Sequence, residues 1–126
     1  MREILFRGKR KNPFNNNEWV YGFLINFPNS ETEICYEYDE DWEDNNCEAV
    51  IPETVGEFTG ILDNNGNKIF EDDIVELIDN TTRKGRIVYE GAEWFIVFHL
   101  SGGLMYSPLS RYESKNLEVI GNKFDK

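Results

Sequence analysis

Apolar positions that alternate with polar ones recur in short runs along most of the chain. This period of two predicts β-strands, because successive side chains of a strand point to opposite faces of a sheet. The strongest early run covers residues 19–27, which are rich in aromatic and branched side chains and precede a Pro-Asn-Ser turn. Shorter runs lie at residues 4–6, 34–38 and 49–51. The N-terminal part is therefore expected to be β-rich.

The alternation becomes more regular in the C-terminal part. Residues 73–78, 85–89 and 93–100 form three consecutive runs separated by short segments that contain glycine, and a last run covers residues 117–122. Short strands joined by tight turns are typical of small barrels, which close on themselves to avoid exposed edges. We therefore predict an SH3-like β-barrel in this part of the chain.

The prediction for the whole chain is an all-β fold that forms one compact molecule. Its expected parts are an N-terminal β-rich segment over residues 1–70 and the barrel over residues 71–126. Phe58 and Trp94 are predicted to lie in the core, and the Asp-Asn-Asn-Gly sequence at residues 63–66 predicts a turn.

Composition indicates a packed protein with an acidic surface. The 126 residues are 40% hydrophobic and 14% aromatic, and 13 Lys+Arg face 24 Asp+Glu for a net charge of −11. Nucleic-acid binding is not expected, since contacts to phosphates need a basic face. Neither a membrane-spanning apolar run nor a signal-peptide cleavage site is recognisable. We expect a cytoplasmic protein of a bacterial host cell with no membrane contact.

The charges are unevenly distributed along the chain. Residues 31–48 carry nine carboxylates and no cation, whereas residues 7–11 carry four cations. Patches of opposite sign predict self-association into a homo-oligomer, with the apolar strand 19–27 as the surface to be covered. A solvated acidic loop is the simpler interpretation of residues 31–48. Mimicry of DNA, directed at a DNA-binding protein of a host, is a further hypothesis.

Cysteine and histidine restrict the possible chemistry. Cys35 and Cys47 are expected to be free thiols, with a disulfide across the acidic loop as the alternative. His99 is the single histidine, so a structural zinc site is excluded, and an ordinary half-buried strand histidine is expected. No cofactor is predicted.

Two carboxylate clusters are candidate metal sites, and weak binding of a divalent cation is one hypothesis for the first of them, residues 39–44. Residues 39–44 do not form an EF-hand loop, because Asp44 and Val50 occupy the positions that require Gly and Glu. Residues 71–73 are expected to shape the turn into the next strand. The alternative is a metal-assisted enzyme that uses Glu53 with the carboxylates of residues 71–73. No metal site and no catalytic residue is assigned.

Several ordered motifs resemble the YopX family of phage and prophage proteins over nearly the whole chain. They are REILFRG at residues 2–8, WVYG at 19–22, the block from Val50 to Gly60, KIFE at 68–71, DIV at 73–75 and EVIGN at 118–122. The resemblance implies a β-rich fold with an SH3-like C-terminal part and self-association. It implies no particular biochemical activity, so the expected function is that of an accessory protein whose partners are its own copies or a host or phage protein.

One position departs from the family pattern. The family usually carries Glu-Gly-Asp-Ile where this chain has Glu71-Asp72-Asp73-Ile74. If that glycine takes a positive φ, Asp72 is expected to be a strained substitute. As candidate binding residues we select seven side chains from the shared motifs, namely Trp19, Tyr21, Glu53, Thr54, Phe58, Thr59 and Asp73.

Overall fold

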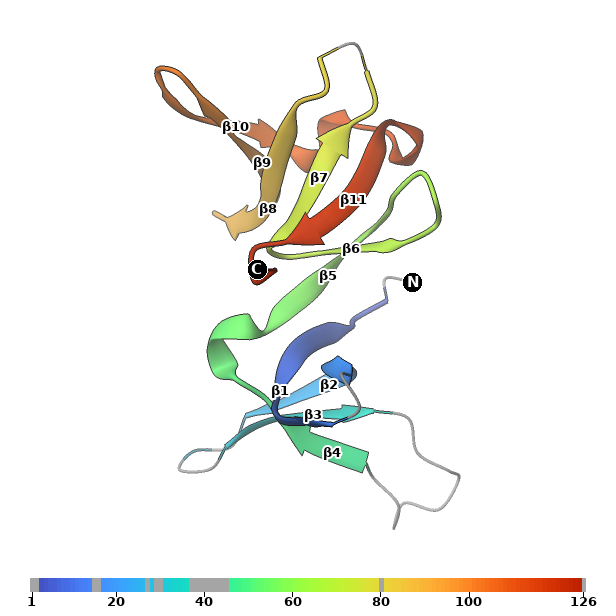
Figure 1. The fold of residues 1–126 in the computed structure, drawn as a ribbon, viewed down its shortest axis with the longest axis vertical. Coiled ribbons are helices and arrows are strands. Elements are labelled where there is room, and N and C mark those ends of the chain that lie inside the picture. The colour runs from blue at the N-terminus through green and yellow to red at the C-terminus, as the bar shows by residue number, and fades with distance from the viewer. Residues whose placement is uncertain are drawn as a thin grey trace. The chain divides into compact units, whose positions relative to one another are not determined.

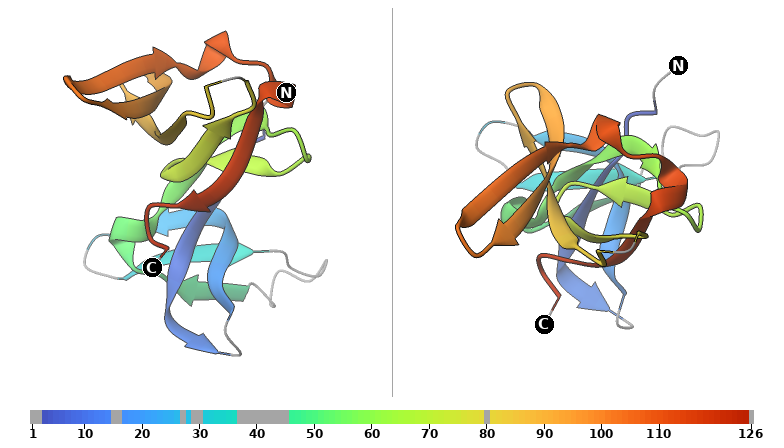
Figure 2. Two further views of the ribbon diagram at one scale, coloured as in Figure 1. Left: turned by 45° about the horizontal axis from the view of Figure 1, so that its top comes forward. Right: turned by 90° about the horizontal axis from the view of Figure 1, so that it is seen from above.

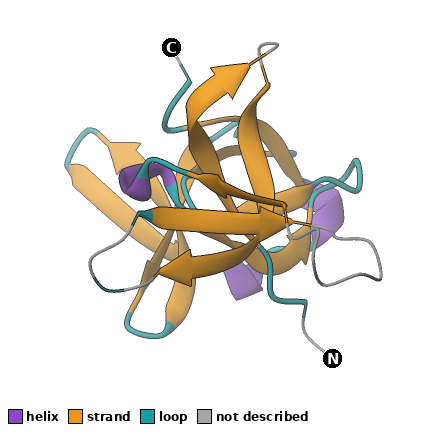
Figure 3. Cartoon of the chain, turned by 90° about the horizontal axis from the view of Figure 1, so that it is seen from below, coloured by secondary structure: helices purple, strands orange, loops and turns teal. Residues whose placement is uncertain are grey.

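The computed structural model describes residues 3–14, 17–26, 28, 31–36, 46–79 and 81–125. Within these ranges the chain forms β-strands and three single-turn 3₁₀ helices, with no α-helix (Figure 3). The all-β prediction is thus confirmed. The chain divides into two compact units, unit 1 with residues 1–58 and unit 2 with residues 59–126.

Unit 1 is built from antiparallel strands that lie in the spatial order β4-β3-β2-β1-β5 (Figure 1). Their bounds are β1 Phe6–Phe14, β2 Asn17–Asn26, β3 Thr32–Tyr36, β4 Asn46–Ala49 and β5 Gly56–Leu62, with the 3₁₀ helix η2 at Pro52–Thr54. β1 also contacts the segment after β4, where Arg10 and Val50 form an isolated antiparallel bridge. The N–H of Ile51 donates to the carbonyl of Lys9 at 2.8 Å. The four-stranded part therefore curls until its two ends meet.

The core of unit 1 lies inside this curl. Val20, Ile34 and Val50 are its fully buried members. Gly22 faces the same interior, and a Cβ added there would lie 2.3 Å from the carbonyl oxygen of Cys35. Only glycine allows β2 and β3 to approach this closely, which explains the glycine of the WVYG motif.

Unit 2 is centred on a five-stranded antiparallel sheet with the order β10-β9-β8-β7-β11 (Figure 2). Its elements are β6 Lys68–Phe70, β7 Asp73–Leu77, β8 Lys84–Glu90, β9 Glu93–Leu100, β10 Gly103–Pro108, η3 Leu109–Arg111, η4 Ser114–Asn116 and β11 Leu117–Asn122. β6 pairs with β5, and the orange β9–β10 hairpin projects from the rest of the sheet in Figure 2.

Alternate residues of these strands fill the core of unit 2, as the period of two predicts. The buried cluster consists of Ile69, Val75, Leu77, Ile87, Ile96, Phe98, Leu109 and Leu117. Trp94 is only half-buried and packs at the side of this cluster, with its ring 4.8 Å from that of Tyr89. Phe58 of unit 1 is 4% exposed. The core prediction is therefore confirmed for Phe58 and holds only in part for Trp94.

The five-stranded sheet is open in the pairings that the described residues make. β10 and β11 are its two edges, and the chain between them forms η3 and η4 instead of a further strand. Leu109 of η3 inserts into the core, so this connection covers the sheet rather than pairing with it. No closed barrel is found in the described pairings, whereas the predicted β-rich C-terminal part is present and its SH3-like character stays a prediction. The units divide inside β5, and the predicted boundary after residue 70 stays a prediction.

Asp63 is a buried carboxylate that organises the turn between β5 and β6. The N–H groups of Asn65 and Asn67 donate to its Oδ1 at 2.9 and 2.8 Å, as the predicted turn requires. The N–H of Val119 in β11 donates to its Oδ2 at 3.0 Å. Burial raises the pKa of Asp63. The hydrogen bonds from Val119, Asn67 and Asn65 together lower the pKa by more than burial raises it, so the pKa lies below its ordinary value.

Asp72 lies in the turn between β6 and β7 with a φ of 69°. Its N–H donates to the carbonyl of Ile87, and its carbonyl accepts from the N–H of Lys123, both at 2.8 Å. The next residue, Asp73, is 2% exposed and accepts the N–H of Phe70 at 2.7 Å. Asp72 thus has the positive φ on which the expected strain depends, and Asp73 shapes the turn as expected.

Asp63→Asn should destabilise the chain by about 2–3 kcal/mol at pH 7, because the amide replaces an ionised acceptor of several N–H groups. The folded pKa of Asp63 is lowered, so its stabilisation is complete above the ordinary pKa of aspartate and is lost as the pH falls through the lowered value. The difference between the variant and the parent chain should thus narrow below about pH 4. Urea denaturation over a pH series measures it, with the exposed Asn64→Ala as control. A difference that stays constant down to pH 2 would contradict an ionised Asp63.

Asp72→Gly should stabilise the chain by up to about 1 kcal/mol, because glycine adopts a positive φ without steric cost. Asp72→Val should destabilise it, since a β-branched side chain is most strained there. Thermal unfolding of both variants measures the effect, with Glu76→Gly as the control for a glycine placed inside a strand. Equal stability of the Gly and Val variants would show that φ at residue 72 is not positive.

Candidate functional site

The seven predicted binding residues are distributed over both units. Trp19, Tyr21, Glu53, Thr54 and Phe58 belong to unit 1, whereas Thr59 and Asp73 belong to unit 2. Four of the seven, Thr54, Phe58, Thr59 and Asp73, are buried. The remaining three reach solvent at least in part.

Both buried threonines hold the backbone through their hydroxyl groups. Thr54 accepts the N–H of Lys9 at 2.8 Å and donates to the carbonyl of Ile51 at 2.6 Å. Thr59 donates to the carbonyl of Ile69 at 2.8 Å and accepts the N–H of Ile61 at 3.1 Å. Both hydroxyl groups are therefore occupied by backbone groups. They position the surrounding chain and do not form part of an exposed binding surface.

Three aromatic side chains of β2 lie together on the outer face of the unit 1 sheet. Val20 points into the core, so the alternating residues Trp19, Tyr21 and Phe23 point outward, and we call these three the β2 aromatic surface. Tyr21 is 46% and Phe23 is 56% exposed. Rings of this size are normally buried, and their exposure next to each other is typical of a contact surface.

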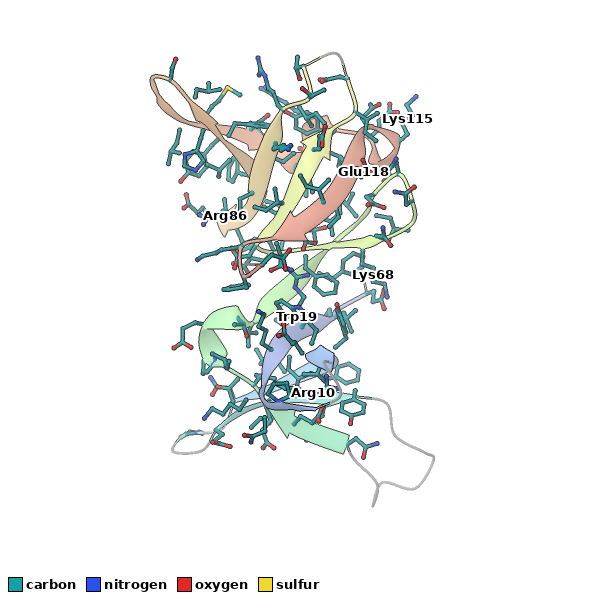
Figure 4. The ribbon with its side chains drawn as sticks, viewed as in Figure 1. Arg10, Trp19, Lys68, Arg86, Lys115 and Glu118 are labelled. Carbon is teal, nitrogen blue, oxygen red and sulfur yellow. A yellow bond between two sulfur atoms is a disulfide. The ribbon has the colours of Figure 1, made fainter. Side chains whose placement is uncertain are left out.

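Cations from β1 hold one end of the β2 aromatic surface. The guanidinium of Arg7 lies 4.6 Å and the ammonium of Lys9 lies 5.6 Å from the Trp19 ring centre. Arg10 donates through Nη1 to the carbonyl of Trp19 and through Nε to Glu48, both at 2.6 Å (Figure 4). The two cations pack the Trp19 indole against β1, so this end of the surface is held in place within unit 1.

Part of the predicted charge separation is neutralised within unit 1. Arg10 pairs with Glu48 of β4, and Lys11 pairs with Glu31 at 2.8 Å. Two carboxylates from the ends of the acidic stretch 31–48 thus meet two cations of the basic group 7–11. The middle of the stretch, including the weak cation site considered at residues 39–44, lies outside the described residues.

The two cysteines form a disulfide, which corrects the expectation of free thiols. Cys35 of β3 and Cys47 of β4 lie directly opposite each other in the strand register. Directly opposite side chains of antiparallel strands share one face, so their sulfur atoms meet. The sequence contains the two alternating segments, but only the register shows that these residues face each other.

No metal centre is found among the carboxylates that the structure describes. Within the described ranges, no three His, Cys, Asp or Glu side chains gather closely enough to hold a metal ion. Glu53 belongs to unit 1 and residues 71–73 belong to unit 2, so the carboxylates of the hypothetical enzyme come from different units. The Asp73 carboxylate already accepts the N–H of Phe70.

A basic groove in unit 2 was not anticipated from the sequence. It has a volume of about 460 Å³ and is lined by Ile74, Lys84, Gly85, Arg86, Val97, His99, Leu104, Tyr106 and Lys123. His99 is exposed here rather than half-buried as predicted. Lys84 and Arg86 alternate with the buried residues Gly85 and Ile87 of β8. This alternation is the one sequence signal that could have placed both cations on the outer face of the sheet.

Residues 5–126 match a family model described as YopX protein. A search of curated proteins gave no match. No described part of the chain forms a helix with the length and apolar character needed to cross a bilayer.

Reduction of the Cys35–Cys47 disulfide should lower the stability of the chain by up to about 3 kcal/mol, the loss expected for a closed loop of about 15 residues. The sequence separation of the two cysteines is 12 residues. Urea denaturation with and without a thiol reductant, with the thiols counted by alkylation, measures the loss. The Cys35→Ser, Cys47→Ser double variant is the control and should not respond to reductant. Two reactive thiols in air-oxidised protein would contradict the disulfide.

Proposed function

The chain belongs to the YopX protein family, and we propose that it is a phage or prophage accessory protein that acts through protein–protein contacts, first of all with other copies of itself. Its place of action is the cytoplasm of the bacterial host. There a reducing environment would favour the dithiol form of Cys35 and Cys47. No catalytic step is part of this proposal.

The observation that carries the proposal is the β2 aromatic surface. Aromatic residues and arginine are enriched at the centres of protein interfaces, where they supply much of the binding energy. Tyr21 and Phe23 are about half exposed, while Arg7 and Trp19 already contact each other. A partner that covers the two exposed rings would bury apolar area beside the Trp19 indole, which Arg7 already holds in place.

Charge favours a second copy as the occupant of this surface. Two chains of net charge −11 repel each other, so they approach best where cations reduce the local negative charge. Lys9 is close to Trp19 and pairs with Glu18 at 3.5 Å, which places both signs beside the aromatic surface. In a two-fold interface the same patch meets itself, so Lys9 of one copy can face Glu18 of the other.

Phe23→Ser should weaken self-association by at least about tenfold, the loss expected for a central aromatic interface residue. Light scattering over a concentration series measures the association. Ile78→Ser is the matched control, because Ile78 of unit 2 is 43% exposed and lies outside the β2 aromatic surface. A parent chain that stays at 14.8 kDa at high micromolar concentration would overturn the proposal. Equal effects of the Phe23→Ser and Ile78→Ser variants on self-association would show that the β2 aromatic surface is not the interface.

A further inference from the structure

The basic groove lies on the face of the unit 2 sheet opposite to the core. Ile74, Arg86, Val97 and Tyr106 occupy directly opposite positions on β7, β8, β9 and β10, so they form one row across the sheet. Val97 is only 4% exposed although it points away from the core, which shows that its neighbours stand above it. The row therefore forms the floor and walls of a real depression.

The charge of the groove is opposite to that of the chain. Its lining includes Lys84, Arg86 and Lys123, and none of the lining residues is acidic. The chain as a whole has 24 acidic and 13 basic side chains, so such a collection of cations is unusual for its surface. Glu76 lies opposite Lys84 in the strand register but does not line the groove. The groove therefore favours a negatively charged ligand.

The rest of the lining is apolar and aromatic. Leu104 is 54% and Tyr106 is 45% exposed, and the Phe95 and Tyr106 rings pack in a T-shaped arrangement with their centroids 5.8 Å apart. A volume of about 460 Å³ lies within the range of pockets that enclose side chains or small ligands, about 300–1,000 Å³. A ligand that fits both properties carries carboxylates together with aromatic rings.

We propose that the basic groove binds the acidic segment 37–44 of a second copy of this chain. That segment reads Glu-Tyr-Asp-Glu-Asp-Trp-Glu-Asp, with six carboxylates, two aromatic rings and no cation. Its carboxylates pair with Lys84, Arg86 and Lys123 at the rim, and an aromatic ring packs on Tyr106. Exposed ion pairs contribute little individually, so the ring contact supplies much of the affinity.

This inference rests on the proposed self-association but not on the β2 aromatic surface. The groove of one copy and the acidic segment of the next are different patches, so the contact is heterologous. Contacts of this kind close into rings or continue into filaments. A nucleic-acid strand would also bring negative charge and rings, and the experiment separates it from the peptide.

A fluorescent peptide of residues 36–45, which lacks cysteine, tests the chemistry of the groove by fluorescence anisotropy with the full chain. Arg86→Glu should weaken peptide binding by at least about tenfold, because it replaces an attractive charge with a repulsive one. Lys84→Glu should weaken peptide binding in the same way. Because Lys84 is exposed, this variant provides the test if the Arg86 variant does not fold. Lys115→Glu is the matched control, since Lys115 of η4 pairs with Glu113 and lies away from Arg86 (Figure 4).

Three results would overturn the groove assignment. One is a loss in the Lys84 and Arg86 variants no larger than that in the Lys115 variant. Another is unchanged binding of a peptide whose carboxylates are replaced by amides. The third is an oligothymidine of equal charge that binds more tightly than the peptide, which would assign the groove to nucleic acid.

A mixing experiment tests whether the segment comes from a second copy, and it uses the Phe23→Ser background to remove the β2 contact. One variant carries Lys84→Glu with Arg86→Glu, and the other carries amides in place of the carboxylates of residues 37–44. Each alone should be monomeric, and the mixture should form a complex of about twice the mass of the chain, since one partner keeps the segment and the other keeps the groove. A mixture that stays monomeric while the peptide binds would overturn the contact between copies. If the Phe23→Ser background keeps some association through the β2 contact, the increase in mass on mixing, relative to each variant alone, still reports the groove contact.

Discussion

The buried carboxylate of Asp63 is the constraint on which the arrangement of unit 2 depends. It joins the β5–β6 turn to β11 across 56 residues of sequence, because its Oδ2 accepts the N–H of Val119. β11 in turn forms one edge of the five-stranded sheet, and Lys123 follows its end. The N–H of Lys123 donates to the carbonyl of Asp72, so the same set of contacts positions one cation of the basic groove.

Arg10 has the corresponding role in unit 1. Its side chain is 9% exposed and connects three strands, since it contacts Glu48 of β4 and the carbonyl of Trp19 in β2. A buried charge is tolerated only when its hydrogen bonds are satisfied, and Glu48 supplies the countercharge. The cations of β1 are therefore used mainly to hold the curled sheet and the Trp19 indole. The cations of unit 2 line a groove instead.

The sequence by itself determined the features that depend on neighbouring residues. Strands of alternating apolar side chains follow from the period of two, and they make the chain all-β. The turn at residues 63–66 follows from its Asp, Asn and Gly residues, which favour turn conformations. The glycine that the family pattern carries at position 72 was a local signal for the positive φ that Asp72 adopts. Each of these features involves a local backbone conformation or a short sequence motif.

Only the tertiary structure decided what depends on strand register. Cys35 faces Cys47, and Arg86, Val97 and Tyr106 lie in one row across the sheet, because antiparallel strands pair at particular residues. A shift of one residue would turn each of these side chains to the other face of its sheet. The disulfide, the basic groove and the bond from Val119 to Asp63 therefore could not be read from the one-dimensional pattern. The pattern shows which residues alternate, whereas pairing across strands determines which of them meet.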